Sequence, residues 1–277
     1  MLCDLHLHSD RSDGEFSPES VIDAVADAGV ELAALTDHDT TTGHADARRR
    51  AAERGVRFVG GIEMTTYGAG RVVHVLGLGV SHTDEDLRFA NAQTTQAFGA
   101  NQERWVRFLA SQGIRVEWER DFTDAPVRLP VLIERLCRRG FEDGDPQRCH
   151  AAFRAFFGAL PPEAYSGLPT PAQGAAIIRG AGGVAFLAHP AELVDDGLAD
   201  QWLDELDGLE AMYLRYDTDR RSELVGLARR RGKLYSCGSD WHGWFQGPYV
   251  NPRFEAPPDL LQRLSIRTFR QPKSSVD

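Results

Sequence analysis

Lysine is nearly absent from this sequence, which has only Lys233 and Lys273 among its 277 residues. Any side-chain clamp on a phosphate group must therefore come from arginine. The formal net charge of −10 argues against broad electrostatic binding to duplex DNA. It does not exclude a small phosphorylated substrate, because bound divalent cations would reverse the sign of the charge locally.

Cysteine and long apolar runs are also scarce. The four cysteines, Cys3, Cys137, Cys149 and Cys237, show no CxxC spacing, so neither a disulfide framework nor a zinc ribbon is expected. No apolar run approaches the length of a membrane span, and the first residues resemble a strand and not a signal peptide. We therefore expect a cytoplasmic protein with reduced thiols and no association with membranes.

Strands and helices are expected to alternate in two blocks. Short apolar runs predict strands at 2–7, 32–35, 58–62, 72–78, 184–188, 209–214 and 234–237. Ser17 and Thr170, each followed by proline, are typical helix caps. This alternation favours an α/β protein with a parallel sheet or barrel.

The middle of the chain lacks that alternation. One long helix is expected at 85–112, and shorter helices near 131–139 and 147–157. We interpret residues 81–167 as a helical insertion that covers the site. Residues 1–80 and 168–277 then form the main barrel domain, with a short helix and a strand near 266–269 at its end.

Polar side chains that bind metals recur where these strands end. His6 and His8 are two residues apart, so they share one face of the first strand, and Asp13 follows on a turn closed by Gly14. The further candidates are His38, Glu63, His74, His189, Asp240 and His242. In α/β barrels the carboxyl edge of the strands is where active sites are built. The remaining histidines, His44, His82 and His150, are expected on the solvated surface.

Five motifs in this order resemble those of the polymerase and histidinol phosphatase (PHP) family. They are Asp4-x-His-x-His-Ser, Leu35-Thr-Asp-His-Asp39, Gly61-Ile-Glu63, Leu187-Ala-His-Pro190 and Gly238-Ser-Asp-Trp-His242. The layout is most similar to the PHP phosphoesterases that act on nucleoside 3′,5′-bisphosphates and on RNA 5′ ends. The resemblance implies a distorted (β/α)7 barrel, similar to a TIM barrel, with a helical insertion.

The resemblance also implies a centre of two to three divalent metal ions. His6, His8, Glu63 and Asp240 would hold one ion, and Glu63 would bridge to a second ion bound by His74 and His189. A third ion would be held by Asp13, His38 and His242. Mixed imidazole and carboxylate ligands suit manganese, iron or zinc without selecting among them.

Such a centre suits the hydrolysis of phosphate esters. The ester is already anionic, so attack by hydroxide requires charge neutralisation and a nucleophile available near neutral pH; two metals sharing a hydroxide supply both. We expect a metal-dependent phosphatase acting on a small phosphorylated metabolite or nucleotide. One alternative is a phosphodiesterase, either a 5′→3′ exonuclease on short RNA or a cyclic-phosphate hydrolase. Another is a non-catalytic metal-binding or regulatory domain, but such a domain would be expected to have lost some of the nine ligands. A C–N hydrolase is disfavoured because no lysine ligand is present.

Three further residues are candidates for the reaction itself. Asp37 is either a partner that orients a ligand histidine or a helix cap. Arg128 and Arg215 stand where relatives have phosphate-binding residues; each either grips a phosphate or forms a surface salt bridge. The aromatic residues Trp241, Trp244 and Phe245 either stack on a base or pack under the tail. The sequence predicts no oligomeric state.

Overall fold

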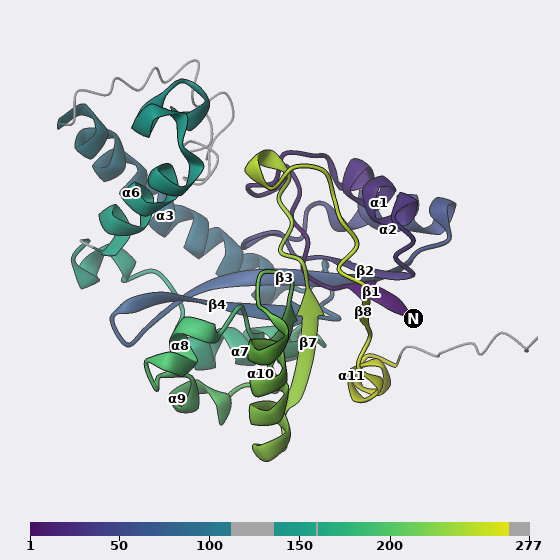
Figure 1. Cartoon of the computed structure of the whole chain (residues 1–277). Coiled ribbons are helices and arrows are strands. Elements are labelled where there is room, and N and C mark those ends of the chain that lie inside the picture. The colour runs from purple at the N-terminus through teal and green to yellow at the C-terminus, as the bar shows by residue number, and fades with distance from the viewer. Residues whose placement is uncertain (112–135, 159, 266–277) are drawn as a thin grey trace, which may run out of the picture.

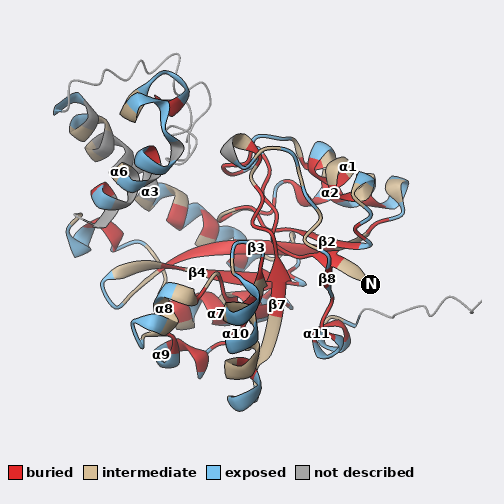
Figure 2. Ribbon diagram, in the orientation of Figure 1, coloured by how far each residue is buried: buried red, intermediate tan, exposed pale blue. Residues whose placement is uncertain are grey.

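A computed structural model describes residues 1–111, 136–158 and 160–265 of the chain. Its centre is an eight-stranded sheet in the order β7-β6-β5-β4-β3-β2-β1-β8 (Figure 1). The strands are β1 Leu2–Asp4, β2 Leu32–Leu35, β3 Arg57–Gly68, β4 Arg71–Leu78, β5 Val184–Leu187, β6 Gly208–Tyr213, β7 Leu234–Gly238 and β8 Phe254–Glu255. Most of their residues are buried, as Figure 2 shows in red, which places the strands at the core of the molecule.

Two blocks of parallel strands flank one reversed strand. β1, β2 and β3 pair in parallel, and so do β5, β6 and β7. Between the blocks β4 is antiparallel to both β3 and β5, so the expectation of a parallel sheet is wrong at this strand. The reason is local: Ala69 and Gly70 both have positive φ and turn the chain directly from β3 into β4 as a hairpin.

The sheet nearly closes into a barrel where β1 and β7 meet. The Leu5 amide donates to the Cys237 carbonyl at 3.1 Å, and the Asp240 amide donates to the His6 carbonyl at 2.8 Å. One buried apolar cluster includes residues from seven strands, among them Cys3, Leu76 and Phe186, and fills the inside of the barrel. The distorted (β/α)7 barrel implied by the resemblance is thus confirmed.

Helices cover the outside of this barrel. They are α1 Pro18–Asp27, α2 His44–Arg54, α7 Pro171–Gly180, α8 Ala191–Asp195, α9 Ala199–Leu203 and α10 Thr218–Arg230. A further helix, α11 Pro258–Arg263, packs Leu260 and Leu261 against the cluster inside the barrel. The predicted caps are confirmed, because Ser17 accepts from the Ser20 amide and Thr170 forms a capping box with Gln173. Within the described ranges no helix is long and apolar enough to span a membrane.

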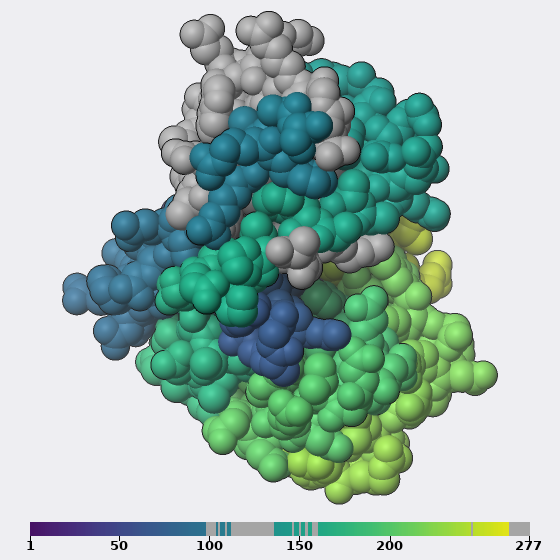
Figure 3. Space-filling model, turned by 90° about the vertical axis from the view of Figure 1, so that its left-hand side faces the viewer, coloured from purple at the N-terminus to yellow at the C-terminus, as the bar shows by residue number. Residues whose placement is uncertain are grey.

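The insertion between β4 and α7 is helical where it is described. It contains α3 Glu85–Ser111, η1 Phe141–Gly144, α6 Pro146–Gly158 and η2 Pro162–Tyr165. In Figure 3 these blue and teal segments stand above the green helices of the barrel. The predicted helix near 131–139 is described only from residue 136, and the predicted elements near 266–269 lie outside the described residues. The division into a barrel and an insertion domain stays a prediction.

Candidate metal centre

The structure brings the nine candidate ligands together at the carboxyl edge of the parallel strands. His6 and His8 follow β1, His38 follows β2, and His189 follows β5. Asp240 and His242 follow β7, and the loop after His8 adds Asp13. Glu63 lies within β3, because this strand continues to Gly68 and does not end at residue 62 as predicted. His74 lies within β4, inside the strand predicted for 72–78.

Glu63 lies at the middle of the group and is 1% exposed. Its Oε2 lies 3.0 Å from His6 Nε2 and 3.2 Å from His8 Nε2. Its Oε1 lies 3.2 Å from His74 Nδ1 and 3.0 Å from His189 Nε2. The two oxygens of one buried carboxylate therefore face two different sets of imidazoles.

Asp240 completes the first set. Its Oδ1 lies 3.4 Å from His6 Nε2 and 3.2 Å from His8 Nε2. His6, His8, Glu63 and Asp240 thus form a group of four buried side chains whose ligand atoms lie within 4.8 Å of one another. This is the first of the three ligand sets that the resemblance implies.

Asp13 collects the remaining histidines. Its Oδ1 lies 3.3 Å from His242 Nε2 and 3.5 Å from His8 Nδ1, and its Oδ2 lies 3.6 Å from His38 Nε2. His38 also faces Glu63, with its Nδ1 3.4 Å from Oε2. His8 and His38 therefore each lie between two groups of potential ligands.

These distances fit metal ions placed between the side chains. Two ligands about 2.1 Å from one ion lie roughly 3.0–3.4 Å apart in octahedral or tetrahedral geometry. Both ring nitrogens of His8 and the Nδ1 of His38 are buried without a hydrogen-bond partner. Buried polar atoms are rarely left without a partner, so their aim at shared points is a positive sign of bound cations.

Neighbouring charges hold the carboxylates in the form that binds metals. Burial would raise the pKa of Glu63, but the attraction of neighbouring imidazoles, His6 foremost, outweighs burial and holds the pKa well below its ordinary value. His38 itself is a neutral imidazole, because burial lowers its pKa to about 3. Ionised carboxylates and neutral imidazoles are the states in which these groups ligate metals.

Comparisons with known proteins identify the family of the chain. A family model described as the PHP domain matches residues 4–129. A protein of Eggerthella lenta named phosphoribosyl 1,2-cyclic phosphate 1,2-diphosphodiesterase is 31% identical over 263 residues, covering 92% of this chain and 100% of that protein. The chain belongs to the PHP family.

Other PHP relatives are named for different activities. A 5′-3′ exoribonuclease of Haemophilus influenzae is 29% identical, with 88% of this chain and 92% of that protein covered. A 3′,5′-nucleoside bisphosphate phosphatase of Chromobacterium violaceum is 29% identical, with 88% of each covered. A solved structure of an amidohydrolase from C. violaceum with bound sulfate superposes with a TM-score of 0.81 at 26% identity, covering 96% of both chains.

Near the candidate ligands, Asp37 organises the loop that bears Asp13. Its carboxylate accepts hydrogen bonds from the Ser9 amide and hydroxyl, both at 2.7 Å, and from the Ser12 hydroxyl at 2.6 Å. Burial raises its pKa above the ordinary value. These bonds fix the backbone turn between His8 and Asp13. Whether Asp37 also orients a ligand histidine stays a prediction.

The two predicted arginines are placed unequally. Arg128 lies outside the described residues. Arg215 is exposed after β6, with its guanidinium 6.0 Å from the centre of the Tyr213 ring. Tyr213 in turn contacts the ligand Asp240, so Arg215 stands at the rim of the centre.

For other aromatic side chains, the structure corrects the expectation for His44 and favours packing over stacking for Trp241. His44 is not on the surface: it is 1% exposed, and its Nε2 lies 2.7 Å from the Gly61 carbonyl. It supports the strand that bears Glu63. Trp241 packs in the core against Phe16, with ring centres 5.2 Å apart, so it is not available to stack on a substrate. Trp244 donates from its indole to the Asp13 carbonyl at 2.8 Å.

The sequence analysis missed two residues of β6 that contact ligands. Glu210 accepts from the His189 amide at 2.8 Å and lies 2.9 Å from His6 Nδ1. The Tyr213 hydroxyl donates to Asp240 Oδ2 at 2.8 Å. A charged residue inside an apolar strand was the available signal for Glu210, because carboxylates are seldom buried without a role.

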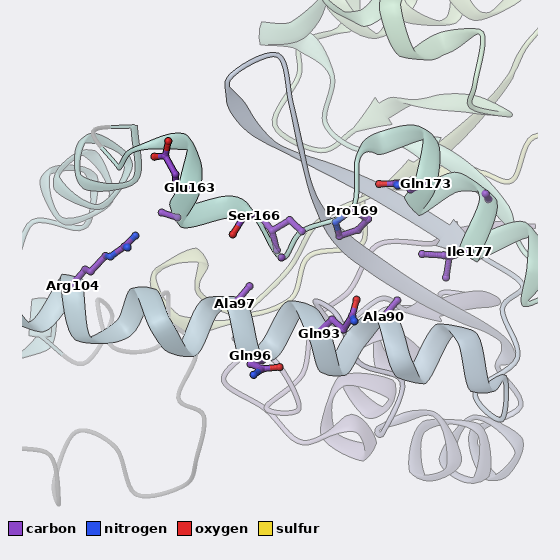
Figure 4. A pocket seen from close by; sticks show the side chains of 14 residues that line it. Ala90, Gln93, Gln96, Ala97, Arg104, Glu163, Ser166, Pro169, Gln173 and Ile177 are labelled. Carbon is purple, nitrogen blue, oxygen red and sulfur yellow. The ribbon is translucent and has the colours of Figure 1, made fainter.

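A separate hollow of about 900 Å³ lies between α3, η2 and the start of α7 (Figure 4). Gln93 and Ala97 of α3 line one side, and Ser166, Pro169 and Gln173 line the other. None of the nine candidate ligands lines this hollow. The chemistry of the centre therefore does not take place there.

Proposed function

We propose that this chain, a metal-dependent phosphoesterase of the PHP family, hydrolyses a phosphate monoester of a small phosphorylated metabolite or nucleotide. The observation that supports this proposal most is the position of the Glu63 carboxylate, whose two buried oxygens face separate sets of imidazoles. A carboxylate in that position can hold two cations a few ångströms apart, the arrangement used in phosphoester hydrolysis.

The nine side chains are proposed to hold two to three divalent ions of manganese, iron or zinc. His6, His8 and Asp240 hold one ion with Glu63; His74 and His189 share Glu63 with a second ion; Asp13, His38 and His242 hold a third. When bound, these ions supply positive charge for the phosphoryl oxygens and a water of lowered pKa.

Charge explains why the ions are needed. Glu63, Asp13 and Asp240 place three negative charges in the centre, which would repel a phosphate ester. Two or three divalent ions more than neutralise them, so the net charge of the centre becomes positive. Arg215 at the rim adds a cation that can form two hydrogen bonds to a phosphate.

A phosphodiesterase is the second candidate. The E. lenta relative, at 31% identity, is named for a cyclic phosphate substrate, and the H. influenzae relative for RNA. A cyclic diester or a short 5′-phosphorylated RNA would meet the same cations. The products differ: a monoesterase releases free phosphate, whereas opening a cyclic diester leaves a monoester.

The test is hydrolysis by the manganese-reconstituted protein across a panel of substrates. The panel holds nucleoside 3′,5′-bisphosphates, mononucleotides, sugar phosphates, a 1,2-cyclic sugar phosphate and a short 5′-phosphorylated RNA, with products followed by ³¹P NMR and chromatography. His189→Ala removes a proposed ligand, and His82→Ala changes a half-exposed histidine outside the centre. Release of free phosphate by the wild type and His82→Ala, lost in His189→Ala, supports the monoesterase. Turnover of only diesters favours the second candidate, and no turnover of either class by metal-loaded protein contradicts both.

A further inference from the structure

β6 contributes none of the nine proposed ligands, yet it touches three of them. Glu210 and Tyr213 both leave this strand and end on ligand residues that belong to other strands. Glu210 is fully buried and Tyr213 is 5% exposed. Two such contacts from one strand require an explanation, because residues three apart in a regular strand point to opposite faces.

A β-bulge supplies the explanation. Against β7, Glu210 pairs with Ser236 but Met212 pairs with Cys237, so Ala211 is an extra residue on β6. Successive pairs of a ladder alternate between faces, so the pairs of Glu210 and Tyr213 share one face. A bulge redirects side chains in this way, and bulges are frequent beside active sites.

The Glu210 carboxylate contacts two ligands from different proposed metal sites. Its Oε1 lies 2.9 Å from His6 Nδ1, and a carboxylate can only accept, so the proton of His6 sits on Nδ1. His6 Nε2, which faces Glu63 Oε2 at 3.0 Å, is then the nitrogen that would bind a metal. The other oxygen of Glu210, Oε2, accepts a hydrogen bond from the His189 amide at 2.8 Å.

The second bond secures an unusual backbone. His189 has a φ of +29°, a backbone conformation that only a few per cent of non-glycine residues adopt. A buried hydrogen bond to its amide offsets part of the cost of this conformation. The ring of His189 is thereby held toward Glu63.

Tyr213 acts on Asp240 in a similar way. Its hydroxyl donates to Oδ2, which leaves Oδ1 to face His6 and His8. Asp240 also has positive φ, at +55°.

We propose that β6 is a positioning strand whose bulge directs Glu210 and Tyr213 onto the metal ligands. Glu210 fixes the tautomer of His6 and the backbone of His189, and Tyr213 fixes which oxygen of Asp240 meets the metal. This inference rests on the metal centre of the proposed function. Partners of this kind typically change metal affinity by about 10–100-fold.

The test compares metal binding by the full-length chain and four variants. Glu210→Gln places an amide donor against either His6 Nδ1–H or the His189 N–H, so one bond must be lost. Tyr213→Phe deletes only the hydroxyl. The matched controls are Glu205→Gln, at an exposed position just before β6, and Tyr235→Phe, at a half-buried tyrosine of β7. Mn²⁺ and Co²⁺ are the probes, with dissociation constants from equilibrium dialysis and the visible spectrum of bound Co²⁺ as the readouts.

The expected results differ between the two variants. Glu210→Gln weakens two classes of site by about 10–100-fold, because it touches ligands of both. Tyr213→Phe weakens one class and shifts the Co²⁺ spectrum, because it changes the donor set of one ion. The controls keep wild-type constants and spectra, and the thermal unfolding of every metal-free variant is compared to show that it folds.

The outcomes separate this inference from the proposed function. If the wild type binds metals and a folded Tyr213→Phe binds them with the same constants and spectrum, the positioning role is wrong for Tyr213. If a folded Glu210→Gln does the same, the inference as a whole is overturned. Should Glu210→Gln fail to fold, Tyr213→Phe alone decides. A wild type that binds neither ion contradicts the metal centre itself.

Discussion

At the scale of single residues, the centre depends on a side chain that contacts two sets of candidate ligands at once. Glu63 offers one oxygen to His6 and His8 and the other to His74 and His189. This carboxylate lies within the twelve-residue strand β3, and Glu63 is 1% exposed. Removing its charge should therefore disturb two proposed sites together.

We expect Glu63→Gln to lower the rate of phosphate-ester hydrolysis by at least about 100-fold. This is the largest loss of activity typical for residues that only support a metal ligand, and Glu63 is proposed to bind the metals directly. The amide keeps the size of the side chain but cannot bridge two cations with two anionic oxygens. Bound metal per chain, measured by mass spectrometry after dialysis, should fall in parallel. Full metal content with unchanged turnover would show that Glu63 does not bridge.

His8 determines how metal binding depends on pH. Burial alone would lower its pKa, but the carboxylates of Asp240 and Glu63 outweigh burial and raise the pKa of His8 to about 10 in the metal-free protein. The ring is therefore cationic at neutral pH and must lose a proton before it can ligate. His38, whose pKa burial lowers to about 3, has no proton to lose there.

Metal binding should thus release protons, and affinity should increase with pH by up to about tenfold per pH unit for each proton released, until the pH passes about 10. Calorimetric titration with Mn²⁺ in two buffers of different ionisation enthalpy measures the number released. Proton uptake, or an affinity that falls as the pH is raised from 6 to 9, would contradict a cationic His8 in the metal-free protein.

At the scale of elements, the junction of β1 with β7 fixes the distance between ligands that are far apart in sequence. Gly238 ends β7 directly against His6: a Cβ at this position would lie 2.3 Å from the His6 Cβ and 2.8 Å from its amide nitrogen. Glycine is required there because the two backbones approach too closely for any side chain.

Gly238→Ala should destabilise the protein by about 1–3 kcal/mol, since one strand must move to admit the methyl group. It should also weaken metal binding, because His6 and Asp240 follow shortly after the two strands that separate. Gly180→Ala at the end of α7 is the matched control, as nothing lies within 4 Å of its added Cβ. Denaturant unfolding and metal titration of both variants provide the measurements. Equal stability of the two variants would refute the close approach.

The sequence predicted the elements and the ligand set better than it predicted how they are supported. Strand ends could be recognised because apolar runs stop at polar ligands, and parallel strands bring those ends to one edge. The contacts of Glu210 and Tyr213 could not be predicted, because they depend on a β-bulge that interrupts the alternation of side chains between the two faces of β6. His44 was misplaced because its burial comes from a contact with Gly61, seventeen positions away along the chain, which periodicity within α2 does not reveal.

At the scale of the whole molecule, the fold brings carboxylates together in a buried centre, where protonated histidines or bound cations must balance their charge. The chain has a formal net charge of −10, and three carboxylates meet in one buried centre. Bound cations remove that repulsion and join loops that follow β1, β2, β5 and β7. Metal binding should therefore stabilise the entire barrel and not just the site.

Removing the metals with a chelator should lower the melting temperature. A ligand at about 1,000 times its dissociation constant contributes about 4 kcal/mol to stability, which corresponds to a shift of roughly 10 °C for a chain of this size. Calorimetry before and after chelation, followed by addition of Mn²⁺, measures the loss and its recovery. A melting temperature that neither falls nor recovers would mean that the cations do not link these loops.

The most direct test of the central claim is to add Mn²⁺ stepwise to metal-free protein and to measure bound metal and phosphate-ester turnover on the same samples. The structure predicts no turnover without metal, turnover that rises as ions bind, and saturation at two to three ions per chain. Turnover by the chelated protein, or saturation with no bound metal, would contradict the claim that these nine residues form the catalytic metal centre of a phosphoesterase.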